Sequence, residues 1–137
     1  MLMQHIIEVT THRENELIDI TERVNQFVEK ARIKTGSLMV YVQGATAGIM
    51  IQENWDDSVQ TDVLDLLNKL APQGVWKHDR IDNNGAAHLK SGIVGPSECI
   101  PVVDGKTGLS TWQNVFLCEF DGPRKSRKIV LTLHQIK

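Results

Sequence analysis

The chain has 137 residues, of which 41% are hydrophobic and 23% are charged, with a formal net charge of −2. These values predict a single folded domain and exclude a disordered chain. The near-neutral charge lacks the basic excess of a nucleic-acid partner. Uninterrupted apolar runs are far shorter than the about 20 residues that a bilayer requires. No secretory signal is visible in the first residues, so we expect a cytoplasmic protein without membrane contact.

Two segments have the period of an amphipathic helix. Apolar residues recur every three or four positions over residues 20–31, and Asp19 with Glu22 is a candidate capping box. The same spacing recurs over residues 59–70, directly after the acidic and hydroxyl residues at 56–58 that favour a helix start. Because each apolar stripe is one-sided, we expect both helices to lie on a sheet.

Alternating apolar and polar residues predict the strands. Asp104-Gly105 is typical of a hairpin turn, and Trp112 is expected in the core. Several strands are apolar on both faces, which favours a sandwich or a sheet covered by another subunit. The fold class is therefore a single α+β domain over residues 1–137, with mainly antiparallel sheets or a sandwich and two amphipathic helices. The predicted strands are residues 37–42, 48–52, 98–103, 112–120 and 128–136.

Cys99 and Cys118 both lie in strand-like apolar runs. We expect both to be small buried hydrophobic residues of a cytoplasmic protein. The sequence has no CxxC motif and no Cys/His zinc pattern.

The first candidate site is the segment 44–54, which has two glycines and small residues between two predicted strands. Such a turn could bring backbone N–H groups to an anion, or it could be a tight connection without a ligand. It fits neither a Walker loop nor a dinucleotide-binding fingerprint.

The second candidate site is the polar segment 76–90, which carries two histidines ten residues apart with carboxylates between them. Imidazole and carboxylate groups suit zinc, manganese or another divalent ion. An imidazole can equally serve in acid–base catalysis, and either histidine could simply be a surface or core residue. A short helix is expected to begin near Gly85-Ala86.

The third candidate site is the segment 119–128, in which an Asp-Gly-Pro turn precedes Arg124 and a basic run. The run is typical of a solvated face or of an edge strand protected by charge. Alternatively, a guanidinium held by the turn could clamp a phosphate or carboxylate.

Taken together, these motifs resemble the YjbQ family over almost the whole chain. The order and spacing of two of them are specific: Ala87-His88-Leu89-Lys90 and Phe120-Asp121-Gly122-Pro123-Arg124. Others are Thr46-Ala47-Gly48-Ile49, Glu53-Asn54 and Thr111-Trp112-Gln113.

The resemblance implies a homotrimer with polar residues gathered in a cleft near the subunit boundary. This chain departs from the family pattern at Gly44, where many members have histidine. The implied catalytic residues are Glu53, His78, His88 and Arg124. Candidate substrate-binding residues are Thr46, Asn84, Lys90 and Gln113. Candidate ligands for a divalent metal ion, zinc or magnesium, are His78, His88 and Asp79.

The resemblance also implies an activity, that of a secondary thiamine-phosphate synthase, which is a transferase with small anionic substrates. Departure of pyrophosphate needs charge neutralisation, which Arg124, Lys90 and a divalent ion held by Glu53 or Asp79 would supply. Two alternatives stay open. The same groups could hydrolyse a small phosphate or acyl ester with metal assistance. The chain could also be a trimeric metal- or anion-binding protein without turnover.

Overall fold

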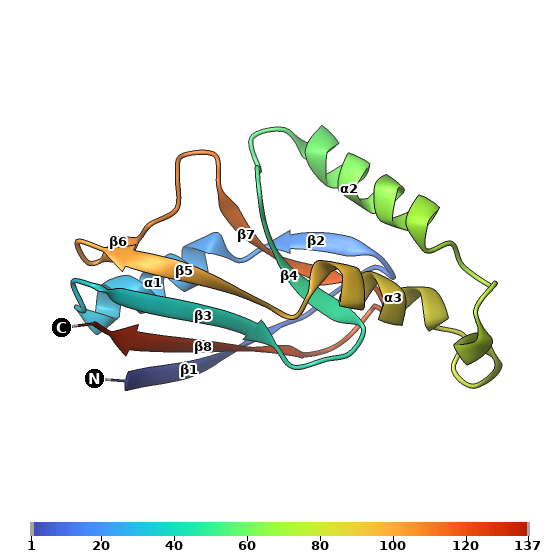
Figure 1. The fold of residues 1–137 in the computed structure, drawn as a ribbon, viewed down its shortest axis with the longest axis horizontal. Helices are drawn as coiled ribbons and strands as arrows, with labels where there is room; N and C mark the ends of the chain where they lie inside the picture. Colours follow the sequence, from blue (N-terminus) through green and yellow to red (C-terminus); the bar gives the residue numbers. More distant parts are fainter. Residues whose placement is uncertain (1, 137) are drawn as a thin grey trace.

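Eight strands form two antiparallel sheets in the computed structural model, which describes residues 2–136 (Figure 1). The larger sheet has the order β1-β8-β3-β5-β6, and the smaller sheet has the order β2-β7-β4. The strands are β1 (Leu2–Val9), β2 (Glu16–Asp19), β3 (Gly36–Val42), β4 (Ala47–Gln52), β5 (Ser97–Val103), β6 (Lys106–Thr107), β7 (Asn114–Glu119) and β8 (Arg127–Gln135).

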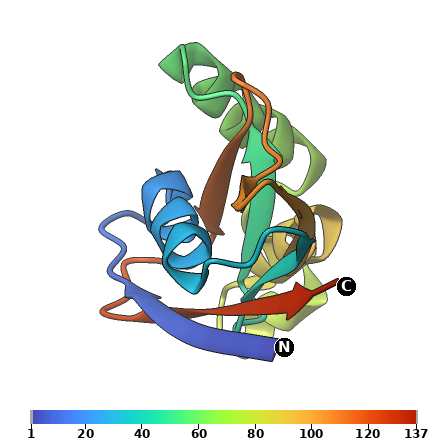
Figure 2. The same cartoon turned by 90° about the vertical axis from the view of Figure 1, so that its left-hand side faces the viewer.

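The helices lie on different sides of the smaller sheet. Helix α1 packs against the inner face of the larger sheet, where Val24 and Val28 join the main core between the two sheets (Figure 2). Helices α2 and α3 contribute to a second apolar cluster on the opposite face of the smaller sheet. The helices are α1 (Thr21–Ala31), α2 (Asp57–Leu70), α3 (Gly85–Val94) and the 3₁₀ turn η1 (Lys77–Arg80).

Strand β7 is buried on both faces because it lies between the two apolar clusters. Leu117 points into the main core, whereas Cys118 packs with Leu67 of α2 and Ala87 of α3. A strand in this position needs apolar residues on both faces, as its sequence has. The predicted α+β fold with antiparallel sheets in a sandwich-like arrangement is therefore confirmed.

Local signals placed several elements correctly. The β5–β6 hairpin turns at Asp104 and Gly105, whose φ angles of 50° and 81° suit a type I′ turn. Helix α2 begins after Asp56, whose side chain accepts a hydrogen bond from the Ser58 backbone N–H.

The start of α1 differs from the prediction. The helix is capped at Ile20 without a side-chain cap, so the capping box of Asp19 and Glu22 is not formed. Asp19 instead accepts hydrogen bonds from the backbone N–H and the hydroxyl of Thr21. The helix ends at Arg32 in the left-handed conformation.

Strands β1 and β2 are absent from the sequence-based predictions. Strand β1 pairs with β8 over its full length, but its alternation is obscured because the exposed His5, stacked on Phe27, takes an apolar position and Ile6 is 49% exposed. Strand β2 has only four residues, too few to show a period.

Two packing predictions are wrong, and one of the two alternatives for the basic run is excluded. Trp112 lies in the loop before β7 and is 53% exposed, in edge contact with Trp55. Cys99 is exposed on the outer face of the larger sheet, which none of the described helices covers, whereas Cys118 is buried as predicted. Strand β8 pairs with both β1 and β3, so the basic run before it does not protect a sheet edge.

Helix α2 is only partly packed against the body of the chain. Leu67 is buried, but Leu66 and Leu70 are each 56% exposed. The predicted apolar stripe exists, but the sheet covers only part of it. No helix within residues 2–136 is long and apolar enough to cross a membrane.

Candidate functional site

Two histidines meet where η1 and α3 face one another. The rings of His78 and His88 are 4.6 Å apart between centroids and nearly perpendicular, with an interplanar angle of 81°. His78 belongs to η1, and His88 lies one turn into α3, where its backbone N–H donates to the carbonyl of Asn84. The ten-residue spacing is bridged by the turn between these elements, and both predicted catalytic imidazoles are brought together.

Asp79 fastens this turn to the helix. One carboxylate oxygen accepts from the backbone N–H of Trp76 at 3.1 Å, and the other accepts from that of Gly85 at 2.8 Å. A Cβ at Gly85 would lie 2.7 Å from the Cβ of Trp76 and 2.8 Å from Asp79 Oδ1. Glycine therefore permits the close approach of α3 to η1.

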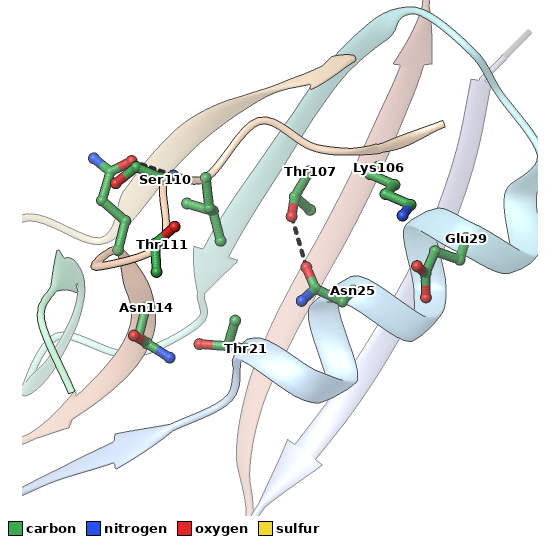
Figure 3. A pocket seen from close by; sticks show the side chains of 10 residues that line it. Thr21, Asn25, Glu29, Lys106, Thr107, Ser110, Thr111 and Asn114 are labelled. Carbon is green, nitrogen blue, oxygen red and sulfur yellow. Dashed lines mark hydrogen bonds between the residues drawn. The ribbon is translucent and has the colours of Figure 1, made fainter. Parts of the chain in front are cut away.

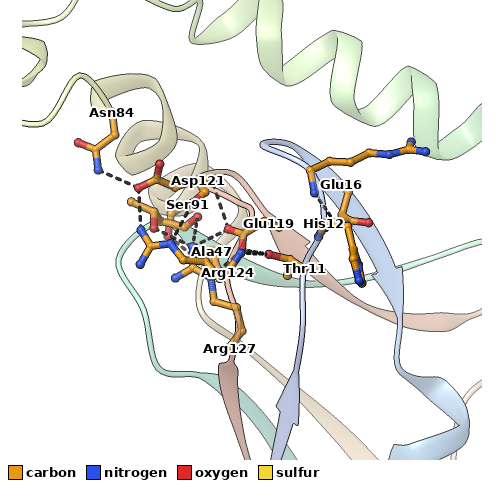
Figure 4. A network of polar contacts seen from close by, with 12 residues as sticks. Thr11, His12, Glu16, Ala47, Asn84, Ser91, Glu119, Asp121, Arg124 and Arg127 are labelled. Atoms are coloured by element: carbon orange, nitrogen blue, oxygen red, sulfur yellow. Dashed lines mark hydrogen bonds and ion pairs between the residues drawn. The ribbon is translucent and has the colours of Figure 1, made fainter.

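Asn84, Asp121 and Arg124 form a second part of the site (Figure 4). Asp121 Oδ2 accepts from Asn84 Nδ2 and from Arg124 Nη2, each at 2.9 Å. Arg124 also donates from Nε to the carbonyl of Asp121. Its side chain is 46% exposed, and Nη1 makes no hydrogen bond within residues 2–136. The Asp-Gly-Pro turn thus holds a half-exposed guanidinium, as the sequence suggested.

A buried ion pair supports this turn. Glu119 is fully buried and Arg127 is 6% exposed. The guanidinium donates from Nε and Nη2 to the two carboxylate oxygens. The pair bridges the two sheets, since Glu119 ends β7 and Arg127 begins β8. Sequence reasoning singled out neither residue, although a glutamate at the end of an apolar strand was an available signal.

Glu119 also holds both ends of the turn. It accepts from the Asp121 backbone N–H at 3.0 Å and from the Thr11 hydroxyl at 2.7 Å. The Thr11 hydroxyl in turn accepts from the Arg124 backbone N–H at 2.7 Å. The buried carboxylate therefore fixes the backbone on which Asp121 and Arg124 are presented.

The segment after β3 serves this ion pair. Arg127 Nη2 donates to the Thr46 hydroxyl at 2.9 Å, and a Cβ at Gly44 would lie 2.8 Å from Arg127 Nη1. Thr46 is buried. The segment is therefore a tight connection between the two sheets, and its predicted substrate-binding threonine holds an arginine of the same chain.

Two polar atoms in the site are buried without a partner. Neither His78 Nε2 nor Asn84 Oδ1 has a hydrogen-bond partner among the described residues. The nearest carboxylate oxygen to His78 Nε2 is that of Asp82, at 3.6 Å, outside hydrogen-bond range. Buried polar atoms are nearly always satisfied, so these two mark a place where a further group belongs.

Lys90 lies on another side of α3, because residues two apart on a helix do not share a face. Its ammonium donates to the side-chain oxygens of Asn15, at 3.1 Å, and of Asn68 in α2. Burial lowers the pKa of Lys90 from its ordinary value, and the nearby charge of Glu14 partly opposes this. The structure therefore does not place Lys90 with the histidines.

Glu53 and Gln113 lie at the opposite end of the smaller sheet. Gln52 pairs with Asn114 at that end, whereas Ala47 pairs with Glu119 at the end near Arg127. A six-residue strand separates its ends by roughly 17–20 Å, so within one chain Glu53 is not joined to the histidine pair. The Gln113 side chain accepts from the Ser110 backbone N–H.

Gln113 also lines a polar cavity of about 310 Å³ between α1, β6 and the loop before β7 (Figure 3). Within it, the Thr107 hydroxyl donates to Asn25 Oδ1 at 2.6 Å. This cavity is separate from the histidine pair.

The described residues of one chain do not bring together three ligands for the predicted zinc ion. Both oxygens of Asp79 are occupied by backbone N–H groups, which leaves two imidazoles. No group of three His, Cys, Asp or Glu residues suited to a metal ion occurs in the part of the chain that the structure describes. Structural and catalytic zinc sites use at least three protein ligands.

The fold and site define a small α+β sandwich with a histidine pair beside an Asp-Gly-Pro-Arg turn. A sequence model described as UPF0047 protein YjbQ-like matches residues 5–136. The chain belongs to the YjbQ family.

Similar proteins match this chain over most of its length and of their own. UPF0047 protein MJ1081 of Methanocaldococcus jannaschii is 41% identical over 86% of this chain and 85% of its own length. UPF0047 protein YugU of Bacillus subtilis is 38% identical over 89% of this chain and 92% of its own length. A crystal structure of a YbjQ-like protein of unknown function from Sulfolobus solfataricus P2 has a TM-score of 0.96, with 38% identity over 99% of both chains. These names state no activity.

Proposed function

We propose that the chain is an enzyme that binds a small phosphorylated molecule between the histidine pair and Arg124. The observation that carries the proposal is the pair of buried, unpartnered atoms, His78 Nε2 and Asn84 Oδ1. They lie in a cluster that also holds a half-exposed guanidinium. A ligand that satisfied them would gain hydrogen bonds without displacing any bond of the folded chain.

Arg124 is the group suited to the phosphate. Arginine presents donors in a planar fork that matches phosphate oxygens. Asp121 accepts from Nε through its carbonyl and from one N–H of Nη2 through its carboxylate, so both N–H groups of Nη1 and the second N–H of Nη2 are available to the ligand. Because Asp121 offsets the positive charge, binding depends on hydrogen-bond geometry more than on net charge.

The histidine pair is suited to moving a proton. The ring centroids are 4.6 Å apart, so one bound molecule can reach both imidazoles, and each ring carries a nitrogen that can donate and one that can accept a proton. This arrangement supports acid–base catalysis by residues of this chain alone.

For the reaction, we propose thiamine-phosphate synthesis, in which a thiazole phosphate displaces pyrophosphate from an aminopyrimidine diphosphate. The thiazole nitrogen is itself the nucleophile, so the chain must mainly position both substrates and stabilise the departing charge through Arg124. The test is growth of a thiamine-requiring strain that lacks its ordinary synthase, together with product formation in vitro. The Arg124→Gln variant is the matched control. Absence of rescue at high soluble expression, with no product in vitro, contradicts the reaction.

We also propose that the chain forms a homotrimer. Large apolar side chains are exposed on the outer face of the larger sheet and along α2. Light scattering after size-exclusion chromatography should give three times the 15.4 kDa of one chain, and a single-chain mass contradicts the proposal. The exposed side chains are Ile6, Met39, Tyr41, Val103, Leu66 and Leu70.

Metal binding stays a prediction, and it requires a third ligand from a neighbouring subunit. Elemental analysis of the purified trimer tests it, with His88→Ala as the comparison. Unchanged metal content in His88→Ala, or no metal in the unmutated protein, contradicts a site on this imidazole.

A further inference from the structure

We propose that Asn84 is a specificity residue, and that the ligand carries a hydroxyl or amino hydrogen next to its anionic group. This inference rests on the proposed function, because it assumes that a small phosphorylated molecule binds beside Arg124. It adds the chemical feature that distinguishes the ligand from other small anions.

The orientation of the Asn84 amide follows from its neighbour. Asp121 Oδ2 already accepts from Arg124 Nη2 at 2.9 Å, and it can only accept from Asn84 as well. The amide nitrogen must therefore face Asp121, and the amide oxygen is turned away from the ion pair (Figure 4). A flipped amide would place two oxygens against each other, so the assignment of the two amide atoms is determined by charge.

The unpaired lone pairs of that oxygen need a donor. Asn84 Oδ1 is buried and has no partner within residues 2–136. A phosphate dianion offers only acceptors, so it would satisfy Arg124 but not this amide oxygen. A ligand hydroxyl or amine supplies the missing donor, and a ligand without one leaves the acceptor buried and unpaired.

The distances allow one small molecule to reach both groups. Asn84 Nδ2 and Arg124 Nη2 are at most 5.8 Å apart, because each lies 2.9 Å from the same carboxylate oxygen. The amide oxygen shares its carbon with Nδ2. The ligand would lie beyond these two atoms, against Oδ1 and Nη1, and a phosphate with a hydroxyl one carbon away is a small molecule that offers both the acceptor and the donor they need. His88 lies one helical turn from Asn84, so the same molecule would lie near the histidine pair.

Two phosphonates of nearly equal size form a matched pair of probes. Hydroxymethylphosphonate carries a hydroxyl where ethylphosphonate carries a methyl group. Isothermal titration of the purified protein, at an alkaline pH where both are dianions, should show about tenfold tighter binding of hydroxymethylphosphonate. In Asn84→Ala this preference should disappear, so that the two probes bind with about equal affinity, because the acceptor is gone.

Asn114→Ala is the control. Its Nδ2 also donates to an aspartate, Asp19, at 3.1 Å, but at the opposite end of β7. This variant should keep the preference for the hydroxyl probe. If Asn84→Ala does not fold, the ratio of the two phosphonate affinities on the unmutated protein still tests whether the site prefers a ligand with a donor.

The outcomes separate the inference from the function. Equal binding of the two phosphonates to the unmutated protein overturns the inference and leaves the phosphate site intact, since water or a second subunit would then satisfy Asn84. Binding of neither probe overturns the proposed function, and this inference with it. A preference that persists in Asn84→Ala also overturns the role of Asn84.

Discussion

Strand β7 carries a polar cluster at each end, and the two clusters differ in how completely the chain satisfies them. At its beginning, Asp19 accepts from the Thr21 backbone N–H and hydroxyl, from Asn54 and from Asn114. These four donors come from α1, from the segment after β4 and from β7 itself. Every one of them belongs to the same chain, so this cluster fastens three elements together.

At the end of β7, the arrangement is similar but incomplete. Glu119 is satisfied by Arg127, Thr11 and the backbone of Asp121. Just outside it, Asn84 Oδ1 is buried and has no partner among residues 2–136. A polar cluster alone therefore does not identify a site. The site is indicated by the groups that the fold buries but leaves unsatisfied.

The largest expected effect is on folding, at Glu119. Glu119→Gln leaves the Arg127 guanidinium buried without a counter-charge, and we expect it to cost about 3–5 kcal/mol of unfolding free energy. Urea denaturation measures the loss. A cost below 1 kcal/mol would show that the buried pair does not support the turn.

A smaller effect is expected on binding, at Arg124. Arg124→Gln removes charge-assisted hydrogen bonds to the ligand, so the affinity for ethylphosphonate should fall about 10- to 100-fold. Lys125→Gln, an exposed neighbour in the same basic run, is the control and should bind within about twofold of the unmutated protein. Equal losses in both variants would mean that only net charge attracts the anion.

The Asp19 cluster should respond in stability alone. Asp19→Ala removes hydrogen bonds at an exposed carboxylate, and the expected cost is about 1–2 kcal/mol. Phosphonate affinity, measured by titration on the same preparation, should not change. Loss of affinity here would falsify the view that the beginning of β7 serves stability alone and its end serves binding.

The smallest effect concerns the pH dependence at Lys90. Because its folded pKa lies below the ordinary value of 10.5, the unfolded chain binds more protons between these two values. The unfolding free energy should therefore rise with pH through that window, and below it the lysine destabilises the fold. Lys90→Met should flatten this rise in urea denaturations at successive pH values. An unchanged slope contradicts the lowered pKa.

Sequence patterns predicted much of the fold because the relevant signals are local. Apolar spacing indicated the strands β3 to β5, β7 and β8, and helix α2 starts where its acidic cap predicts. His78 and His88 were also placed in one candidate site, because both belong to one short polar segment. Trp112 and Cys99 were misplaced, since an alternating pattern does not reveal which end of a strand lies in a loop or which sheet face stays uncovered.

Residue patterns along the chain were sufficient to predict the class of fold, the family and the polar residues of three segments. Which of these residues meet depends on the tertiary structure. Glu53 follows β4 and Arg124 follows β7, and because these neighbouring strands are antiparallel, the two residues lie at opposite ends of the sheet. Glu119 and Arg127 meet because β7 and β8 belong to different sheets that face each other. Such contacts depend on how distant strands pair, and no local pattern of residues encodes that pairing.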